Sequence, residues 1–314
     1  MKKILLVIFI LIVLCLVAVY LIIPANIKIS ATASAYVIPK NVADCLRDPD
    51  TWKKWWPSSE ATASGSNEFV TGNYHYKLVQ RFTDGAEIEM NKAETNFSSR
   101  IFIIPTGKDS SLVEWQTILS GGSNPFRRVT RWFQARDIKK NIQPVLNSLV
   151  NFAADTKNIY GFPIVRTTFT DTILAATKFS SNGYPSTELI YDAIDRLKKK
   201  IKNDGANEKD FPMLNVRQKD SNRFETMIAI CVNKQIKNEG NIFVSRMVPM
   251  RDKFLRTDVT GGPASIEHAH EAIKDYMEDR FLSAPAIPFE ILVTDRREQS
   301  DTTKWKTTIF QPSM

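Results

Sequence analysis

An unbroken apolar run opens the chain. Lys2 and Lys3 precede it, and residues 4–23 contain no charged residue and no glycine. At a rise of about 1.5 Å per residue, a helix of this length is about 30 Å long, which matches the hydrocarbon thickness of a bilayer. We therefore predict a transmembrane anchor over residues 1–23 that contacts the lipid bilayer through residues 4–23.

A cleaved signal peptide is the alternative interpretation of this run. The run is longer than the usual core of such a peptide, and Ala31 and Ala33, which resemble a cleavage site, lie in a predicted strand. The two lysines favour an N-terminus in the cytoplasm. We expect a single-pass protein of the inner (cytoplasmic) membrane, with its body in the periplasm or otherwise outside the cytoplasm.

Strand patterns and then a helical pattern follow the apolar run. Alternating or continuous apolar positions lie at residues 27–36, 74–82, 101–104 and 113–119. From Asn124 the spacing becomes helical, and the apolar stripe consists of Ile142, Val145, Leu146, Leu149, Phe152 and Ala153. Strands followed by one long helix predict an α+β domain at residues 24–156, in which an antiparallel sheet curves around the helix.

The second half contains an internal repeat. Gly183-Tyr184-Pro185-Ser186-Thr187-Glu188 precedes one helical pattern, and Gly262-Pro263-Ala264-Ser265-Ile266-Glu267 precedes another. Each copy predicts a long strand, a helix and two further strands. The first copy is assigned to residues 165–178, 187–202, 213–216 and 224–232, and the second to 242–258, 266–281, 289–294 and 305–310. Two such units predict one antiparallel sheet with both helices on one face and a groove on the other.

The first domain resembles a known superfamily. The stretch from Ala33 to Lys40, the short helix after it, the phrase Asp50-Thr51-Trp52-Lys53-Lys54-Trp55-Trp56-Pro57 and the closing helix are similar to the START and polyketide-cyclase-like (SRPBCC) superfamily. This resemblance implies a helix-grip fold with a cavity for hydrophobic ligands between the sheet and the long helix. The tryptophans either contact such a ligand or, as we favour, pack the short helices onto the sheet.

Residues 158–314 resemble a second family. The repeat, the helix at 267–281 and the ending, with residues 288–295 followed by 304–312, are similar to the GyrI-like small-molecule-binding family. The same domain is the effector-binding part of some AraC-type and MerR-type regulators. This resemblance implies a buried glutamate on the penultimate strand facing a ligand groove, and Glu290 falls there. No helix-turn-helix pattern accompanies it, so we expect no nucleic-acid partner.

Glu290 is the leading candidate for a site residue. It alternates with Phe289 and Ile291, and a carboxylate desolvated among apolar residues requires a partner or a raised pKa. Such a group suits a cationic or hydrogen-bonding ligand, whereas the alternative is an exposed strand glutamate. Leu214 occupies the equivalent place in the first copy. Trp305, on the adjacent strand, either stacks on a flat or cationic ligand or packs in the core.

Catalysis is the alternative to simple binding. Some GyrI-like proteins hydrolyse strained electrophiles with the glutamate and an aromatic hydroxyl, which implies Glu290 together with Tyr191 or Tyr276 on the two helices. Both tyrosines are also compatible with core packing. No nucleophile elbow, P-loop or dinucleotide-binding glycine motif occurs in the sequence. We therefore assign no catalytic residue firmly, and a scaffold whose pockets are filled by side chains is a third hypothesis.

The charge and the histidines change this picture little. The net charge is +8, but the densest basic run, residues 198–202, reads as the solvated end of a helix. His268 and His270 are two residues apart on a helix and cannot share a metal ion on one face. We predict no metal and no cofactor. The sequence thus favours an anchored binding protein for small hydrophobic or cationic molecules.

Overall fold

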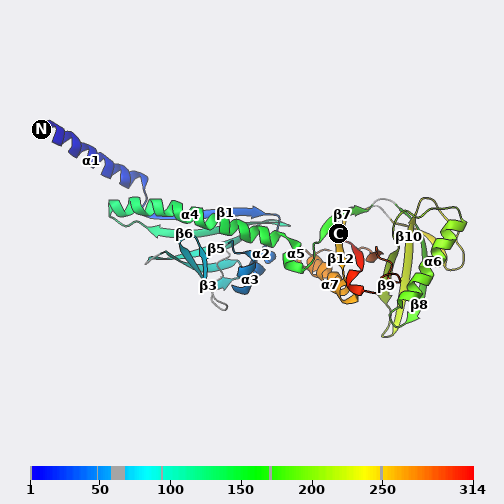
Figure 1. The fold of residues 1–314 in the computed structure, drawn as a ribbon. Coiled ribbons are helices and arrows are strands. Elements are labelled where there is room, and N and C mark those ends of the chain that lie inside the picture. Colours follow the sequence, from blue (N-terminus) through cyan, green and yellow to red (C-terminus); the bar gives the residue numbers. More distant parts are fainter. Residues whose placement is uncertain (1, 48, 58–67, 93–94, 170–171, 248–249) are drawn as a thin grey trace. The chain divides into compact units, whose positions relative to one another are not determined.

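The chain forms two compact units, each built around an antiparallel sheet. The computed structural model describes residues 2–47, 49–57, 68–92, 95–169, 172–247 and 250–314. Unit 1 comprises residues 1–155 and unit 2 comprises residues 156–314 (Figure 1). Because strands and helices are combined in both units, the predicted α+β class is confirmed.

Unit 1 begins with the apolar helix and contains a six-stranded sheet. Its helices are α1 (Lys2–Ile22), α2 (Pro39–Cys45), α3 (Pro49–Trp55) and α4 (Pro125–Ala154). Its strands are β1 (Asn26–Ala35), β2 (Glu68–Thr71), β3 (Tyr74–Phe82), β4 (Gly85–Lys92), β5 (Thr95–Gly107) and β6 (Ser110–Ser120). The sheet order is β1-β6-β5-β4-β3-β2, so β2 to β6 form a meander and β1 pairs with the last strand.

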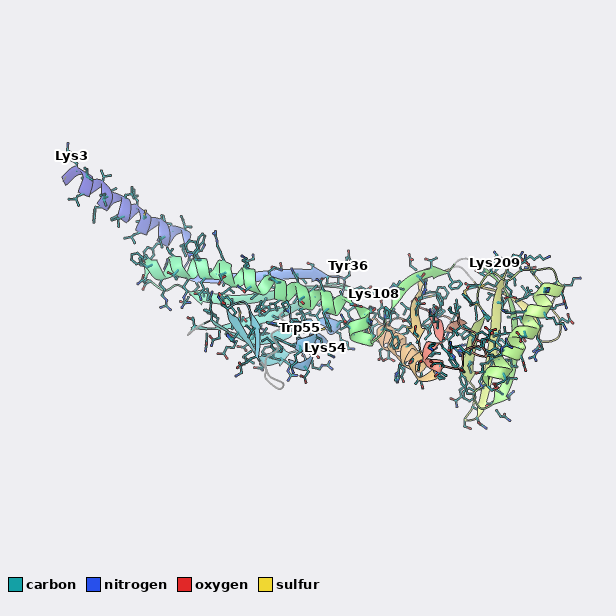
Figure 2. The ribbon with its side chains drawn as sticks, in the orientation of Figure 1. Lys3, Tyr36, Lys54, Trp55, Lys108 and Lys209 are labelled. Atoms are coloured by element: carbon teal, nitrogen blue, oxygen red, sulfur yellow. The ribbon has the colours of Figure 1, made fainter. Side chains whose placement is uncertain are left out.

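Helix α1 carries the apolar run, and most of its surface is exposed. Within the described residues, Lys3–Ile22 is the one helical segment long and apolar enough to cross a membrane, with a mean hydropathy of 3.5. None of that segment is buried against the rest of the chain. Lys3, labelled in Figure 2, lies in the first turn of the helix.

Helix α4 contributes eight buried residues to the core of unit 1. Asn124 caps its first turn, where the Oδ1 atom accepts hydrogen bonds from the N–H groups of Phe126 and Arg127 at 2.9 and 3.2 Å. The helix lies along one face of the sheet (Figure 1). Its buried residues are Ala135, Ile138, Ile142, Val145, Leu146, Leu149, Val150 and Ala153. Phe152, which we predicted in this stripe, is only half-buried.

Unit 2 has an eight-stranded sheet and two long helices. Its helices are α5 (Thr156–Tyr160), α6 (Thr187–Asn203) and α7 (Pro263–Asp279), with a 3-10 turn at Thr302–Lys304. The strands of the first copy are β7 (Val165–Phe169), β8 (Thr172–Asn182), β9 (Met213–Gln218) and β10 (Arg223–Val232). Those of the second copy are β11 (Ile242–Met247), β12 (Met250–Thr260), β13 (Phe289–Leu292) and β14 (Lys306–Pro312).

The two copies exchange their first strands. The sheet order is β11-β8-β10-β9-β13-β14-β12-β7, so β7 pairs with β12 of the other copy, and β11 pairs with β8. Our prediction of one long strand at 165–178 and another at 242–258 is therefore wrong, because each is two strands with different partners. A run of strand-forming residues predicts extended structure but not the neighbouring strand, so the sequence did not indicate the change of partner.

Both faces of this sheet are apolar. Helices α6 and α7 cover one face of the sheet. The cluster under α6 contains Leu214 and Leu292, and the cluster under α7 contains Ile309. The opposite face carries a third cluster, which includes Met213, Phe254, Phe289, Ile291 and Phe310. Side chains therefore alternate between two apolar environments along β9, β13 and β14.

Candidate ligand-binding site

Glu290 lies on the helix-covered face of the sheet in unit 2. Its cross-strand partners are Leu214 on β9 and Ile309 on β14, and both of these side chains belong to the clusters under the helices. We expected a groove on the face opposite the helices, with Glu290 in it. That expectation is wrong for Glu290, because the pairing register directs its side chain to the same face as Leu214 and Ile309.

A cavity of about 650 Å³ lies in front of Glu290. The segments at the starts of α6 and α7 contribute to its wall, together with β9, β13 and the segment after β13. The lining residues are Tyr184, Pro185, Ser186, Thr187, Ile190, Leu214, Asn215, Val216, Pro263, Ile266, Glu267, His270, Pro288, Phe289, Glu290, Arg296 and Trp305. This volume is within the usual range of small-molecule pockets, about 300–1,000 Å³.

The Glu290 carboxylate is paired rather than isolated. Its Oε2 atom lies 3.3 Å from Nη2 of Arg296, and its Oε1 atom lies 3.4 Å from Nε2 of His270. Only 14% of the Glu290 side chain and 8% of the Arg296 side chain are exposed. The partner that a desolvated carboxylate requires is thus supplied by Arg296.

Arg296 is held in place from several sides. Its Nη2 donates to Oγ1 of Thr307 at 3.1 Å, and its guanidinium lies 4.8 Å from the centre of the Trp305 ring. Its backbone N–H donates to the hydroxyl of Tyr191 at 2.8 Å. The Trp305 indole is itself fixed, because Nε1 donates to the carbonyl of Gln299 at 2.8 Å. The cavity therefore has a charged pair beside a positioned aromatic ring.

The structure brings together three of the five predicted ligand contacts. Glu290, Trp305 and Leu214 line the cavity, whereas Tyr191 and Tyr276 are not among its lining residues. Tyr191 is buried in the cluster under α6, and its hydroxyl donates to the carbonyl of Thr294 at 3.1 Å. Tyr276 is buried under α7, where the guanidinium of Arg280 lies 3.7 Å from the ring centre.

Sequence reasoning missed the contributions of Tyr184 and Arg296. Tyr184 stands in the repeat motif before α6, so its place beside the helix start was visible in the sequence. Desolvation of its hydroxyl and the nearby Glu290 carboxylate raise its pKa, while Arg296 opposes the shift. The phenol is therefore a hydrogen-bond donor at neutral pH. Arg296 lies in the turn after β13, outside any periodic pattern.

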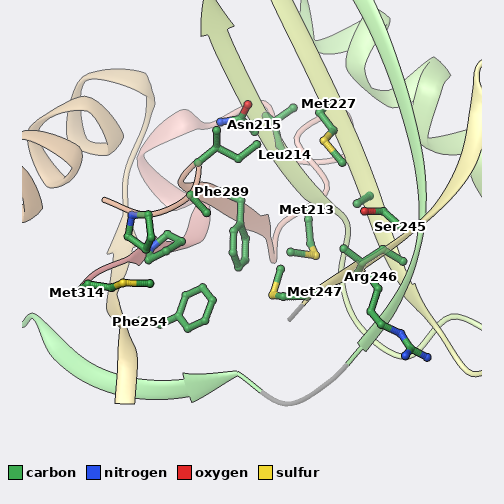
Figure 3. Close-up of a pocket in the computed structure, with 16 residues that line it drawn as sticks. Met213, Leu214, Asn215, Met227, Ser245, Arg246, Met247, Phe254, Phe289 and Met314 are labelled. Atoms are coloured by element: carbon green, nitrogen blue, oxygen red, sulfur yellow. The ribbon is translucent and has the colours of Figure 1, made fainter. Parts of the chain in front are cut away.

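A second cavity, of about 440 Å³, lies on the other face of the same sheet (Figure 3). Met213, Met247 and the ring of Phe289 point toward one another in it, and the guanidinium of Arg246 points away from them. Leu214, Asn215 and Phe289 line both cavities, so strands β9 and β13 form the partition between them.

The tryptophans of unit 1 pack against other aromatic rings. Trp52 and Trp56 are stacked at 5.7 Å, and Trp56 meets Tyr76 edge-on at 5.1 Å. Nε1 of Trp55 donates to the carbonyl of Cys45 at 3.0 Å, which ties α3 to α2. These contacts agree with the packing interpretation of the cluster. Over the described part of the chain, no group of three or more histidine, cysteine or acidic side chains is placed to hold a metal ion.

Comparisons with known proteins give distant structural neighbours. No family model matches the chain, and no curated protein does. The C-terminal domain of EcmrR is 16% identical with a TM-score of 0.42, over 49% of this chain and 98% of that one. A hydrolase from Listeria innocua is 13% identical with a TM-score of 0.36, over 48% and 91% of the two chains. These values leave the GyrI-like resemblance a prediction.

One neighbour was solved in a complex with DNA. EcmrR in that complex is 17% identical with a TM-score of 0.43, and the match covers 60% of this chain and 70% of that one. Our expectation of no nucleic-acid partner therefore has no support from the comparisons and stays a prediction.

Proposed function

We propose that the chain is a membrane-anchored binding protein for small organic molecules, with the Glu290 cavity as its binding site. The observation that carries the proposal is the buried pair of Glu290 and Arg296, which faces a cavity of about 650 Å³ beside Trp305. Ligand pockets typically combine mostly apolar walls with a few placed polar groups. The resemblance of residues 158–314 to GyrI-like domains supports the same assignment.

The charge balance of the cavity favours one kind of ligand. A lone carboxylate would attract cations, but Arg296 offsets the charge of Glu290, so a cationic ligand has to compete with the guanidinium. Flat molecules that carry hydrogen-bond donors and acceptors gain from Trp305, Tyr184 and Glu290 without that competition. We therefore narrow the expected ligands from hydrophobic or cationic molecules to flat, polar and net-neutral ones.

We assign ligand binding to unit 2 and anchoring to unit 1. The SRPBCC resemblance implies a cavity between the sheet and the long helix of unit 1, whereas Trp52, Tyr76 and Trp115 are buried in contact with other aromatic rings. The exposed apolar surface of α1 supports insertion in a bilayer, because soluble proteins rarely expose a continuous apolar area of this size. Lys2 and Lys3 support an N-terminus in the cytoplasm and a body outside it.

A thermal-shift screen of the full chain in lipid nanodiscs tests the proposal. A ligand at a hundredfold excess over Kd stabilises the folded state by about 2.7 kcal/mol, which raises the melting temperature by several degrees. Val216→Trp places an indole in the cavity and removes the shift. Val79→Trp, at an exposed strand position of unit 1, keeps it. Flat polar compounds that give no shift, or the same shift in both variants, would contradict the proposal.

A hydrolase that uses Glu290 is the second candidate. Tyr184 favours it, because this hydroxyl lines the same cavity as Glu290, whereas Tyr191 and Tyr276 do not. Glu290→Gln keeps the shape of the side chain and removes the titratable group. Loss of turnover of a substrate that still binds this variant would support the hydrolase, and unchanged turnover would eliminate it.

A further inference from the structure

A basic hollow lies beside the first turns of α4 in unit 1. It has a volume of about 620 Å³, and its charged lining residues are Lys92, Arg127, Arg131 and Asp137. Nζ of Lys92 lies 2.6 Å from Oδ2 of Asp137, so these two charges offset one another. The hydrogen bond from Lys92 holds the pKa of Asp137 below its usual value, which keeps the carboxylate charged. The two arginines therefore give the hollow its net positive charge.

Neither arginine is used elsewhere in an ion pair among the described residues of unit 1. Nη1 of Arg131 donates to Oε1 of Gln134 at 2.5 Å, which orients the guanidinium. The other N–H groups of this guanidinium can still donate to a ligand. The Arg127 side chain is exposed. Two guanidinium groups one helical turn apart are well suited to the oxygens of a phosphate, which they bind with paired N–H donors.

This hollow is close to the end of α1. Nη1 of Arg128 donates to the carbonyl of Ile23 at 3.1 Å, and its guanidinium lies 4.5 Å from the centre of the Tyr20 ring. The Tyr20 hydroxyl also donates to the carbonyl of Ser123. Arg127 and Arg131 are one and three residues from Arg128, which is about 1.5 and 4.5 Å along the helix axis.

Those distances are smaller than the thickness of the headgroup layer. Each headgroup region of a bilayer is about 5–8 Å thick outside the hydrocarbon core. If residues 4–23 span that core, the first turns of α4 lie next to this layer, because Arg128 contacts Tyr20 and Ile23 at the end of the span. Phe126 and Phe133, which flank the arginines, are 78% and 59% exposed. Exposed phenylalanines together with basic residues are typical of helices that lie in a membrane interface.

We propose that this hollow binds the phosphate-bearing headgroup of an anionic phospholipid, with Arg127 and Arg131 as its contacts. The inference rests on the proposed membrane anchoring. It adds a lipid-specific contact that fixes the first turns of α4 against the bilayer surface. The pairing of Lys92 with Asp137 makes Lys92 a secondary contact.

The test uses the full chain in nanodiscs that contain phosphatidylcholine and phosphatidylglycerol in equal amounts. Native mass spectrometry of the released protein counts the lipids that it retains. We expect the wild type to retain phosphatidylglycerol in preference to phosphatidylcholine. Each of the substitutions Arg127→Gln and Arg131→Gln lowers that retention about fivefold.

The control variants are Arg217→Gln and Arg223→Gln, each of which removes the same single charge from an exposed position of unit 2. Both control variants retain phosphatidylglycerol as the wild type does. Equal retention of both lipids by the wild type, or an equal loss in the controls, would overturn the inference. If Arg131→Gln does not fold, Arg127→Gln alone gives the result, because the Arg127 side chain is exposed.

Two further arms separate the possible causes of a negative result. An alkaline carbonate wash of vesicles with the same lipids tests anchoring by itself. If the wild type stays in the washed vesicles but shows no lipid preference, only the headgroup site is overturned. If the wild type is washed off, both the membrane anchoring and the headgroup site are overturned. In the second arm, soluble glycerol 3-phosphate is added at the same concentration as the lipid, and we expect the bound phosphatidylglycerol to stay in place. Complete displacement of the lipid would show a site for soluble phosphate esters instead.

Discussion

Glu290 and Arg296 form a pair that is nearly removed from water. When one member of such a pair is deleted, the other remains as an uncompensated charge in a poorly hydrated place, and this costs more than the pair contributes. The next residue, Arg297, provides a comparison, because it forms an exposed pair with Asp195 at 2.7 Å. Its arginine side chain is 40% exposed, so water screens the loss of either partner.

Arg296→Gln is therefore expected to lower the free energy of unfolding by about 3 kcal/mol, and Arg297→Gln by less than about 1 kcal/mol. Chemical denaturation of the two variants measures the difference. An aryl ammonium such as benzyltrimethylammonium can replace the missing cation beside Glu290 and restore stability to Arg296→Gln. Equal losses in both variants, or no response to the cation, would show that the Glu290 charge is screened by water.

Buried hydroxyl groups in unit 1 differ in whether they have a partner. The hydroxyl of Tyr76 is buried and has no hydrogen-bond partner among the described residues, whereas that of Tyr74 donates to Oδ2 of Asp137 at 2.8 Å. A buried hydroxyl without a partner loses its hydration and gains nothing in return. We expect Tyr76→Phe to raise stability by about 1 kcal/mol and Tyr74→Phe to lower it by about 1 kcal/mol.

Thermal unfolding of the two tyrosine variants gives the comparison directly, because both remove one oxygen from neighbouring positions of β3. A loss of stability in Tyr76→Phe would mean that this hydroxyl has a partner, such as a buried water that also accepts from the indoles of Trp52 and Trp115.

At the scale of the element, the start of α4 depends on its cap. Asn124 satisfies two N–H groups of the first turn, which also carries the arginines of the basic hollow. Asn124→Ala leaves those groups without an intrachain acceptor and is expected to cost about 1 kcal/mol. Asn124→Ser keeps a capping oxygen and is expected to cost much less. Urea denaturation of both variants checks this, and equal losses would mean that the cap oxygen does not stabilise the helix.

The element order of unit 2 was largely predictable, because helical and alternating patterns repeat at matching positions in its two halves. The pairing of its strands was not. The residues of 165–178 and 242–258 favour strands, but strand propensity does not identify the neighbouring strand, which is set by pairing between positions far apart in the sequence. The face of Glu290 likewise depended on its register with Leu214, which no local pattern determines.

The candidate site was predictable only in part. Glu290 stood out as a charge among apolar strand residues, and Trp305 followed from its place on the next strand. Arg296 did not, because a basic residue in a turn is usually solvated, and its burial results from the packing of the turn over Trp305. The two helix tyrosines were plausible by position, but their rings lie inside the helix–sheet cores.

At the scale of the whole molecule, the chain combines an exposed apolar helix with two compact units of different organisation. Unit 1 has one meander around a long helix, whereas unit 2 has two copies that share a sheet. Part of the net charge of +8 lies at the start of α4, where the two arginines of the basic hollow are close to the end of the apolar helix. Binding and anchoring are thus assigned to separate parts of the chain.

The most direct test of this account is mass spectrometry of the small molecules that copurify with the full chain. The account predicts a flat, polar compound in extracts of the wild type and of Val79→Trp, and its absence from extracts of Val216→Trp, in which the Glu290 cavity is filled. Extracts of all three proteins with the same contents would contradict it, as would a wild type that is empty and shows no thermal shift with any flat polar compound.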